Sequence, residues 1–435
     1  MSETIETPQN DSWSTAKRFL VLFAAATALL AGVAVAHYYV AMKTERVERE
    51  TSELLNVELG KAAIARDLGN TISDLMFMAR HNEPQGLFEN DDPKSRRVLA
   101  EQFLIFSAQK RKYDQIRFLD RTGMEAVRLN YNNGNAVIVR DDQLQNKAQR
   151  YYFSETLDMA PGEVYISPFD LNIERDRIEQ PLKPMIRFGT PVFDHSGRKS
   201  GILLFNYLGE RLIGAFRGAT ANISNHVMLL NSDGYWLSSP RADDEWGFMY
   251  GNNRTFAEAY SNSWQRVQAD DSGQFYDDEG MFSFTTVYPL LYATGRPWPS
   301  GQSGSLAADR GYYWKVVSHV SSQSLAAATG KFFSRQSPLY AAMLGLLAIA
   351  SLLIARTSVR HKRAVSQVAI ERRVRGSLEE KVDERTQELK ETQAEKDQVV
   401  QQLIQAEKMA AIGTMASGIG HEINNPLYAI LGKAE

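Results

Sequence analysis

The sequence predicts an α+β membrane protein. Three observations support this prediction: two long apolar runs without charge, strand-like runs between them, and a heptad pattern after the second run. With 435 residues, 43% of them hydrophobic, the chain can form two or three domains, which excludes wholesale disorder. The net charge of −3 gives no global attraction to nucleic acid, so no nucleic-acid partner is expected. Because there is no cysteine, disulfides and thiolate metal sites are excluded, and we expect no metal site.

The first apolar run covers residues 19–42 and contains 24 residues without a formal charge. At about 1.5 Å per residue, a helix of this length crosses a hydrocarbon layer of about 30 Å. The alternative is a cleaved signal peptide, since Lys17 and Arg18 precede the run and small residues stand at 34–36. The run is longer than a usual signal core. We therefore predict a retained transmembrane helix, with residues 1–18 in the cytoplasm.

The second apolar run, residues 338–355, has 18 uncharged residues and forms most of a predicted transmembrane helix at 336–355. A buried core helix is the alternative. Basic residues resist translocation, and seven of them follow this run within 20 positions. They are Arg356, Arg360, Lys362, Arg363, Arg372, Arg373 and Arg375. This side is therefore predicted to be cytoplasmic, which places residues 44–335 outside the membrane as one large external region.

The external region begins with a predicted long helix at 44–80, a turn-rich stretch at 81–94 and a second helix at 97–113. Runs rich in β-branched and aromatic residues then predict strands. These runs are 115–119, 125–131, 164–169, 185–193, 202–207, 281–290 and 312–320. A Gly-, Pro- and Ser-rich stretch at 293–311 is expected to be an exposed insertion.

A weak internal repeat divides this region. Asp120 to Gly123 and Asp194 to Gly197 form turn signals in which glycine supplies a left-handed conformation. A similar strand and turn recur at 229–234. We therefore predict two stacked modules, a membrane-distal one at 44–218 and a second one at 219–330.

The long helix, the two modules and four short stretches together resemble the tandem PAS-like (double Cache) extracellular sensor of bacterial receptors, and specifically a sensor subfamily of histidine kinases. The stretches are 149–153, 164–172, 184–187 and 206–207. The resemblance covers about residues 44–330 and implies a small-molecule ligand in the membrane-distal module. Chemoreceptors and cyclases share this fold, so a receptor without catalysis and a membrane-bound cyclase remain alternatives.

Five residues of the first module are candidates for binding that ligand: Arg128, Tyr151, Tyr165, Asp170 and Arg187. The two arginines lie in strand-like runs, where a guanidinium can pair a ligand carboxylate in a bidentate manner. Internal ion pairs with Asp170, Glu174 or Glu179 are the alternative use of these arginines. The tyrosines, with Tyr207, can wall a pocket or can be ordinary core residues.

The segment 356–408 is predicted to be a cytoplasmic linker and coiled coil. Its seam alternates in steps of four and three residues, which is the period of a parallel two-stranded coil. The seam positions are Leu378, Val382, Arg385, Leu389, Thr392, Lys396, Val399 and Leu403. We therefore expect a homodimer. A single solvated helix is the alternative.

Residues 409–435 carry the sharpest motif. His421, Glu422, Asn425 and Pro426 form HExxNP on a predicted helix, and Pro426 is expected to bend it just after the histidine. A zinc protease would need a second histidine where Asn425 stands, so that interpretation fails.

With its lead-in of small residues, this segment resembles the H-box of the dimerisation and phosphotransfer domain of sensor histidine kinases. The resemblance implies that His421 is the phosphoacceptor, that Glu422 is its acid/base partner and that Asn425 orients phosphoryl transfer or water. One departure is Gly420, where the family more often has alanine.

The resemblance also implies a two-component kinase in the bacterial inner membrane that uses ATP and Mg²⁺ and passes phosphate to the receiver domain of a response regulator. The printed sequence stops at Glu435 without a nucleotide-binding motif. We therefore expect this fragment to be inactive with ATP alone.

Overall fold

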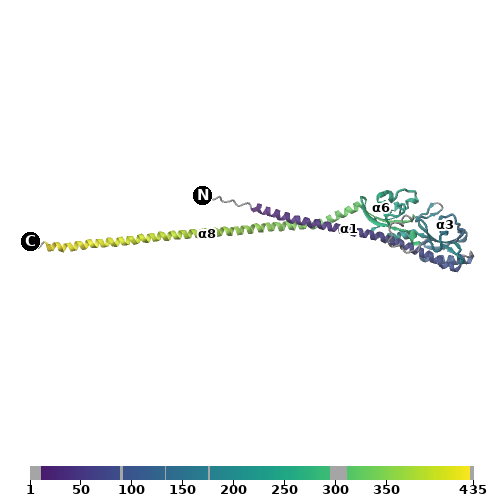
Figure 1. Cartoon of the computed structure of the whole chain (residues 1–435), viewed down its shortest axis with the longest axis horizontal. Helices are drawn as coiled ribbons and strands as arrows, with labels where there is room; N and C mark the ends of the chain where they lie inside the picture. Colours follow the sequence, from purple (N-terminus) through teal and green to yellow (C-terminus); the bar gives the residue numbers. More distant parts are fainter. Residues whose placement is uncertain (1–10, 89–91, 133, 175–176, 294–310, 432–435) are drawn as a thin grey trace. The chain divides into compact units, whose positions relative to one another are not determined.

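The computed structural model describes the backbone of residues 11–88, 92–132, 134–174, 177–293 and 311–431, and their side chains as far as Met415 except at positions 11, 84, 132, 293 and 328. The described chain forms two compact units. Residues 35–337 make up one unit, and residues 1–34 with 338–435 make up the other. Helix α1 (Asp11–Asn82) and helix α8 (Ser322–Leu431) each contribute to both units (Figure 1).

The first sheet of the larger unit has seven antiparallel strands in the order β3-β2-β1-β9-β8-β4, and β5 also pairs with β8. These strands are β1 (Tyr113–Asp120), β2 (Glu125–Asn132), β3 (Asn135–Ile138), β4 (Tyr165–Ile166), β5 (Asp170–Leu171), β8 (Pro184–Phe193) and β9 (Lys199–Leu208). A separate hairpin joins β6 (Ile173–Glu174) to β7 (Arg177–Ile178). The helices of this module are α2 (Pro93–Lys110), α3 (Tyr151–Asp158) and α4 (Gly209–Ala219).

The second sheet has five antiparallel strands in the order β11-β10-β14-β13-β12. These strands are β10 (Val227–Asn231), β11 (Trp236–Ser238), β12 (Ser272–Asp277), β13 (Gly280–Val287) and β14 (Trp314–Ser321). Its helices are α5 (Phe256–Ala259), α6 (Ser261–Ala269) and α7 (Pro289–Ala293). In the first sheet, the five strands β2-β1-β9-β8-β4 follow one another in the same order as β11-β10-β14-β13-β12 in the second sheet. If each set of five is numbered along the chain, this order is 2-1-5-4-3. The first sheet has two further strands, β3 and β5. The two sheets therefore share one strand order, which is the arrangement expected of two like modules.

The turn that repeats between the modules is also confirmed. Gly123 and Gly234 have φ of +79° and +81°, and each donates its N–H to the carbonyl three residues earlier. In both turns the first side chain stabilises the loop, since Asp120 Oδ1 and Asn231 Oδ1 each accept two backbone N–H groups. Gly197 closes a third such turn, with φ of +78°. The local sequence alone specifies these turns, because all their bonds lie within five residues.

Several predicted element boundaries were wrong, and three of them have a clear local cause. The helix predicted to reach residue 113 ends at Lys110, because Arg111 adopts a left-handed φ of 51° and its N–H bonds to Ser107. The strand predicted at 164–169 pairs only over Tyr165–Ile166, since Pro168 has no N–H to donate. The strand predicted to end at 290 ends at Val287, because Pro289 begins α7. The predicted insertion at 293–311 falls largely on residues 294–310, which lie outside the described residues.

Helix α1 runs along both modules of the larger unit (Figure 1). Val57, Ile64, Leu68 and Leu75 are fully or almost fully buried, at helical spacing, in a core shared with strands of both sheets. Gly60 allows close approach of α4, because a Cβ there would lie 2.8 Å from Thr220 Cγ2. The predicted helix at 44–80 is therefore confirmed, and it is the element against which both modules pack.

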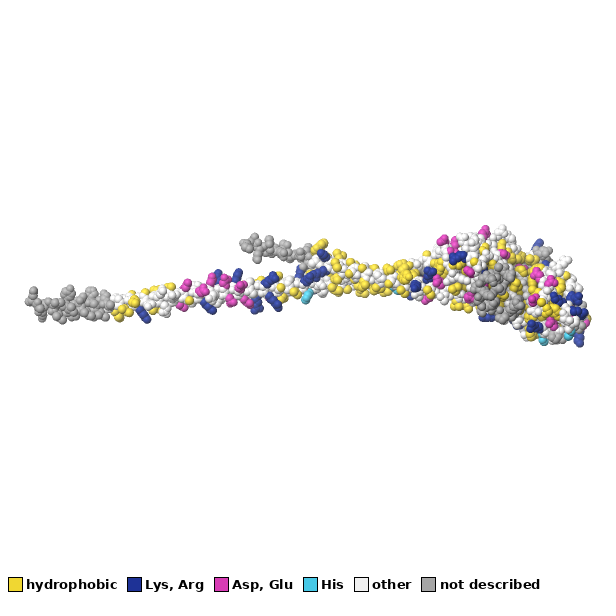
Figure 2. Space-filling view, viewed as in Figure 1, with side chains coloured by type: hydrophobic (Ala, Val, Ile, Leu, Met, Phe, Trp, Pro, Cys, Tyr) yellow, Lys and Arg dark blue, Asp and Glu magenta, His cyan; other side chains and the backbone are white. Residues whose placement is uncertain are grey.

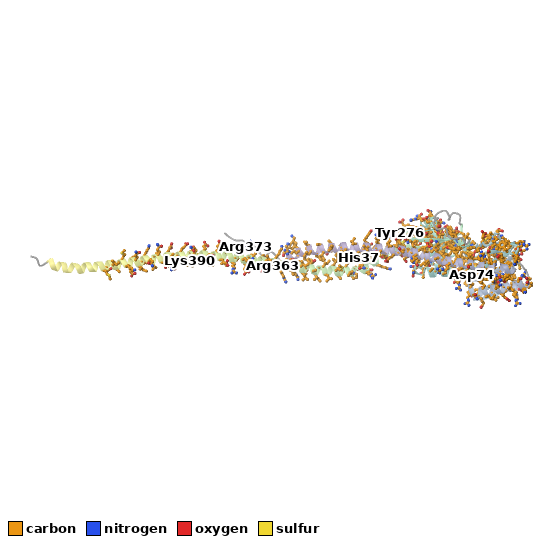
Figure 3. The ribbon with its side chains drawn as sticks, turned by 60° about the horizontal axis from the view of Figure 1, so that its bottom comes forward. His37, Asp74, Tyr276, Arg363, Arg373 and Lys390 are labelled. Carbon is orange, nitrogen blue, oxygen red and sulfur yellow. The ribbon has the colours of Figure 1, made fainter. Side chains whose placement is uncertain are left out.

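The smaller unit contains the second apolar run and most of the first, on parts of α1 and α8. By length and composition, α1 and α8 each contain a stretch able to cross a membrane, and hydrophobic side chains cover these runs (Figure 2). Every described side chain from 361 to 415 is exposed, with Arg373 and Lys390 extending from α8 (Figure 3). These exposed side chains include the seam positions Leu378, Leu389 and Leu403.

Candidate functional site

One face of the first sheet carries a row of polar side chains. Alternation along the strands directs Arg117 of β1, Arg128 of β2 and Arg187 of β8 to the face opposite α1. Arg117 stands directly opposite Arg128, and Arg187 directly opposite Asn206 of β9. Two like charges directly opposite each other destabilise a sheet unless another group compensates them.

Glu125 compensates the first two arginines. Its carboxylate is almost fully buried, with Oε2 2.9 Å from Arg128 Nη1 and Oε1 3.6 Å from Arg117 Nη1. The backbone N–H of Gln145 donates to the same Oε2. Arg117 also donates to Asn206 Oδ1 at 2.7 Å and to Tyr152 Oη at 3.3 Å. Both arginines are thus held by a buried network.

Arg187 forms a second ion pair on this face. Its Nη1 lies 3.1 Å from Asp170 Oδ1, and its Nη2 lies 3.4 Å from Asn172 Oδ1. Burial raises the pKa of the Asp170 carboxyl, although the Arg187 charge opposes that shift. Asp170 therefore bears a desolvation cost as a carboxylate.

The helix α3 places an aromatic ring beside the arginines. The guanidinium carbons of Arg117 and Arg187 lie 5.4 and 5.8 Å from the centre of the Tyr152 ring, within cation–π range. Tyr151, on the same helix, is 44% exposed and packs edge-on against Tyr152. Tyr151 is also electrostatically coupled to Arg187 and Asp170, and burial raises its pKa.

Several buried polar atoms of this face have no hydrogen-bond partner among the described residues. They are Arg117 Nε, Arg128 Nε and Tyr165 Oη, which can donate, and Glu125 Oε1 and Asn130 Oδ1, which accept. Buried polar groups in folded proteins are almost always bonded, and each unbonded one costs about 1–3 kcal/mol. The three donor atoms, beside three guanidinium groups, suit a small anionic molecule with several acceptor oxygens.

The structure therefore brings all five sequence-predicted ligand residues to one module, in two neighbouring groups. Arg187, Asp170 and Tyr151 form one group, and Arg128 belongs to the Glu125 network. Tyr165, on β4, is buried and packs against α3 in the small core that contains Tyr152.

The alternative of internal ion pairing is confirmed for Arg187 with Asp170, whereas Arg128 pairs with Glu125, which we did not consider. Tyr207 is a core residue, because its ring faces α1 and its hydroxyl donates to Asp67. Sequence reasoning missed Arg117 and Tyr152. Arg117 meets the criterion used for the other two arginines, since it stands between Ile116 and Phe118 in a strand-like run.

The predicted phosphotransfer residues His421, Glu422 and Asn425 lie on α8, but their side chains are outside the described residues. The helix continues past Pro426 to Leu431.

The first sheet lies within a match to a known family. The match includes the face that carries Arg117, Arg128 and Arg187, which we call the arginine face. Residues 72–290 match the family of the bacterial histidine kinase sensor domain, and this stretch is half of the chain. The chain belongs to this family. The sensor domain thus includes all of β1 to β13 and the arginine face described above.

Two curated relatives are sensor proteins. The C4-dicarboxylate transport sensor protein DctB of Rhizobium meliloti (strain 1021) is 40% identical over 109 residues, and its namesake from Pseudomonas aeruginosa PAO1 is 33% identical over the same length. Each match covers 22% of this chain and 17% of the relative, so the chain matches about a sixth of those proteins.

Among solved structures, the chain is similar to the extracellular domain of vpHK1S-Z8, a protein assigned as a histidine kinase. The identity is 20% and the TM-score 0.48, over 63% of this chain and 95% of that one.

Proposed function

We propose that this chain belongs to a transmembrane sensor histidine kinase of a two-component system, which detects a small molecule outside the bacterial inner membrane and reports it by phosphorylation inside. One observation carries the proposal: a histidine kinase sensor domain at 72–290 is followed, in the same chain, by the HExxNP motif at 421–426. A chemoreceptor or a cyclase has no need of that motif. Two apolar helical stretches flank the sensor, as a receptor with two spans requires.

The proposed chemistry takes place at His421. A neutral imidazole nitrogen attacks the γ-phosphorus of ATP, an N–P bond forms, and the P–O bond to ADP breaks. Glu422 stabilises the imidazolium cation that develops, and Asn425 orients the phosphoryl group or an attacking water. The phosphoryl group then passes to a receiver-domain aspartate of the response regulator. ATP, with its Mg²⁺, is the phosphoryl donor.

The proposed ligand is a small dicarboxylate bound at the arginine face. Two relatives are named for C4-dicarboxylate sensing, and the face combines Arg117, Arg128 and Arg187 with unbonded donor atoms. One carboxylate of the ligand would bind Arg187 in place of Asp170. The second carboxylate would bind the Nε atoms of Arg117 and Arg128. Tyr165 Oη is a further donor at this site.

The phosphoacceptor is tested by joining an ATP-binding domain from a related kinase after Glu435 and incubating membranes with labelled ATP. We expect an acid-labile, base-stable phosphoryl group that disappears in His421→Ala and forms much more slowly in Glu422→Ala. Asn425→Ala should reduce phosphatase activity more than kinase activity. His361→Ala, on the same helix, is the matched control and should retain the label. Phosphorylation that persists in His421→Ala would contradict the assignment and favour a receptor without catalysis.

The topology is tested with reporter fusions after residues 200 and 370. The first should be active only outside the membrane and the second only inside. The reverse pattern, or cleavage after Ala36, would contradict two retained spans with a cytoplasmic N-terminus.

A further inference from the structure

One segment of the first module, residues 167–170, connects β4 to β5 beside the arginine face. At its end, Asp170 forms the ion pair with Arg187. At its beginning, the Ser167 N–H donates to the Arg187 carbonyl and Ser167 Oγ accepts from the Arg187 N–H, both at 2.9 Å. Because β4 and β5 have two residues each and Pro168 has no N–H to donate, few backbone bonds hold this segment in place.

The same segment contacts the strand that leads out of the sensor. Tyr312 Oη donates to the Ser167 carbonyl at 3.0 Å. The Phe169 ring lies 5.4 Å from the ring of Trp314, the first residue of β14, and 5.1 Å from the ring of Trp246. These three rings are buried in the core that both modules share. A close-packed core leaves no free volume, so a movement of Phe169 would move the tryptophans of the second module.

The Phe169 contact is tightly packed. A Cβ at Gly209, the first residue of α4, would lie 2.3 Å from Phe169 Cε2, so the ring occupies space that only glycine leaves open. Trp246 adopts a left-handed φ of 63°, and its N–H donates to the Trp236 carbonyl at 2.8 Å. A bulky residue keeps such a backbone conformation only where its surroundings enforce it, and conformations of this kind are frequent in switch regions. The Phe169 ring is part of those surroundings.

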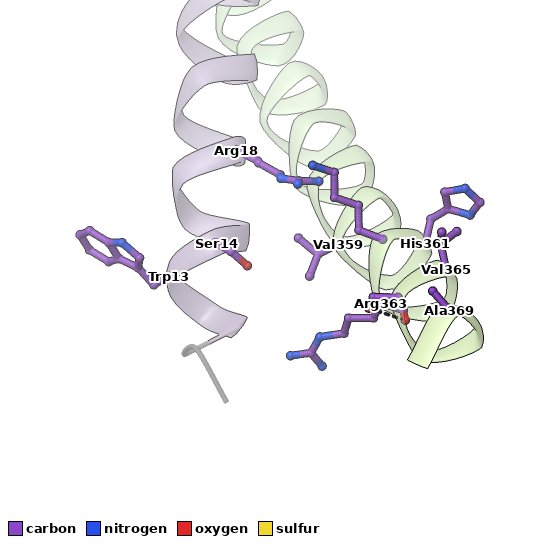
Figure 4. Close-up of a pocket in the computed structure, with 10 residues that line it drawn as sticks. Trp13, Ser14, Arg18, Val359, His361, Arg363, Val365 and Ala369 are labelled. Atoms are coloured by element: carbon purple, nitrogen blue, oxygen red, sulfur yellow. Dashed lines mark hydrogen bonds between the residues drawn. The ribbon is translucent and has the colours of Figure 1, made fainter. Parts of the chain in front are cut away.

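Strand β14 connects this contact to α8. The strand pairs with β13 along its whole length, and α8 begins at the next residue, Ser322. Helix α8 is continuous to Leu431 and contributes to both compact units. In the smaller unit it lies beside the beginning of α1, where Arg18 and Val359 extend toward the space between the two helices (Figure 4). A displacement of Trp314 would therefore reach a helix that leaves the sensor without a break.

We propose that a ligand anion on Arg187 regulates the position of α8 through the contact of Phe169 and Tyr312 with Trp314. This inference rests on the ligand site of the proposed function. Without ligand, Asp170 pairs with Arg187 and the segment holds Phe169 against Trp314. A carboxylate that takes the place of Asp170 releases the end of the segment and with it the Phe169 ring. The two arrangements differ in their contacts at both sites, which is the condition for coupling between them.

Helix α1 also joins the two modules, but it is a less direct route. It packs on the face of the first sheet opposite to the arginine face, so the sheet itself separates α1 from Asp170. The segment 167–170, in contrast, bonds to Arg187 and contacts the second module within four residues.

The test measures the distance between α1 and the start of α8 in the full chain in detergent, by pulsed electron paramagnetic resonance. Spin labels are attached to Glu48→Cys and Gln323→Cys, two exposed positions in a chain without natural cysteine, and labelled chains are diluted with unlabelled ones. Asp170→Ala breaks the ion pair without any ligand and should shift this distance by roughly 1–2 Å, the usual size of helix displacements. Saturating succinate should shift the parent in the same direction. Asp142→Ala, the matched control, breaks an exposed pair with Arg140 in the same module and should cause no shift.

Two further variants test the route. Adding Phe169→Leu to Asp170→Ala should cancel the shift, because leucine lacks the ring that contacts the two tryptophans. Tyr312→Phe removes one hydrogen bond that holds the ligand-free arrangement, so succinate should bind about fivefold more tightly by linkage. Tyr313→Phe is the matched control and should bind as the parent does, since the Tyr313 hydroxyl accepts only one long hydrogen bond of 3.5 Å.

Two results would overturn the inference. A distance in Asp170→Ala equal to that of the parent would show that the ion pair does not control α8, and a shift that persists after Phe169→Leu is added would show that the signal takes another route, such as α1. Succinate separates this inference from the proposed function. A parent chain that binds succinate without a shift refutes the coupling alone. A parent chain that does not bind succinate, while Asp170→Ala still shifts α8, refutes the proposed dicarboxylate and supports the coupling.

Discussion

His226 Nε2, at the start of the second sheet, lies 3.0 Å from Oε1 of Glu53 on α1, and the carboxylate is almost fully buried. Its other oxygen accepts a hydrogen bond of 2.5 Å from Ser318 of β14. Because α8 follows β14 directly, Glu53 joins the helix that enters the sensor to the strand that leaves it. In the first sheet, Asp74 of α1, labelled in Figure 3, has a similar role, since the Tyr113 hydroxyl donates to it at 2.6 Å.

Glu53→Ala should lower the free energy of unfolding of the sensor by about 1–3 kcal/mol, because it leaves the buried Ser318 hydroxyl and the His226 ring without their acceptor. Chemical denaturation of the full chain in detergent measures this loss. Glu58→Ala is the matched control, since Glu58 is half-exposed and its lysine partner lies 4.0 Å away. Equal stability of the two variants would show that Glu53 does not join α1 to the second sheet.

The stability of the sensor should depend on pH through Lys315. Burial lowers the pKa of this lysine to about 8, although its Nζ donates to the Asp270 carbonyl and to Thr286. Its pKa in the unfolded chain is higher, so between about pH 8 and 10.5 the unfolded state binds more protons and stability rises with pH, by at most about 1.4 kcal/mol per pH unit.

Unfolding free energies of the parent and of Lys315→Met, compared across this interval, measure the Lys315 contribution. The parent should gain stability relative to the variant as the pH rises. Lys331→Met, on an exposed part of α8, controls for the loss of a charge and should follow the parent. Parallel curves for all three proteins would contradict a depressed pKa.

Asp170→Asn should strengthen binding of a C4-dicarboxylate, because it removes the internal anion that competes for Arg187. Arg187→Ala should weaken binding at least tenfold, since one charge-assisted pair contributes about 1.5–3 kcal/mol. Calorimetric titration of the full chain with succinate tests both variants.

The control for these variants is Arg198→Ala, which removes an arginine that is 75% exposed and pairs with Asp194 on a surface turn. Its affinity should match that of the parent. A loss of binding in Arg198→Ala as large as in Arg187→Ala would show that the arginine face is not the site. Weaker binding in Asp170→Asn would make Asp170 a ligand contact rather than a competitor.

Single cysteines at Leu389 or Leu403 should form disulfides between two copies of the chain in membranes, because the exposed seam of α8 needs an apolar partner and a parallel coil brings equal positions together. Ala394→Cys, on the opposite side of the helix, should crosslink poorly. Non-reducing electrophoresis provides the measurement, and the natural chain has no cysteine to interfere. Equal crosslinking at all three positions would rule out a defined seam.

The sequence by itself determined the features whose physics is local. Apolar runs specify long apolar helices, and the Asp120–Gly123 and Asn231–Gly234 turns follow from bonds within five residues. The HExxNP motif is likewise contained within a few positions. The strands and the two-module organisation were therefore predictable, apart from ends such as Lys110, where a single left-handed residue stops the helix.

Only the tertiary structure decided which charged groups meet. Arg117 and Asn206 are 89 residues apart, and the pairing of β1 with β9 brings them to a 2.7 Å contact. The same registers turn Tyr207 toward α1 and Arg187 away from it, although both lie on paired strands. A shift of one residue in register would reverse these faces. The arginine face thus depends on strand pairing across the whole sheet, which no local pattern of residues encodes.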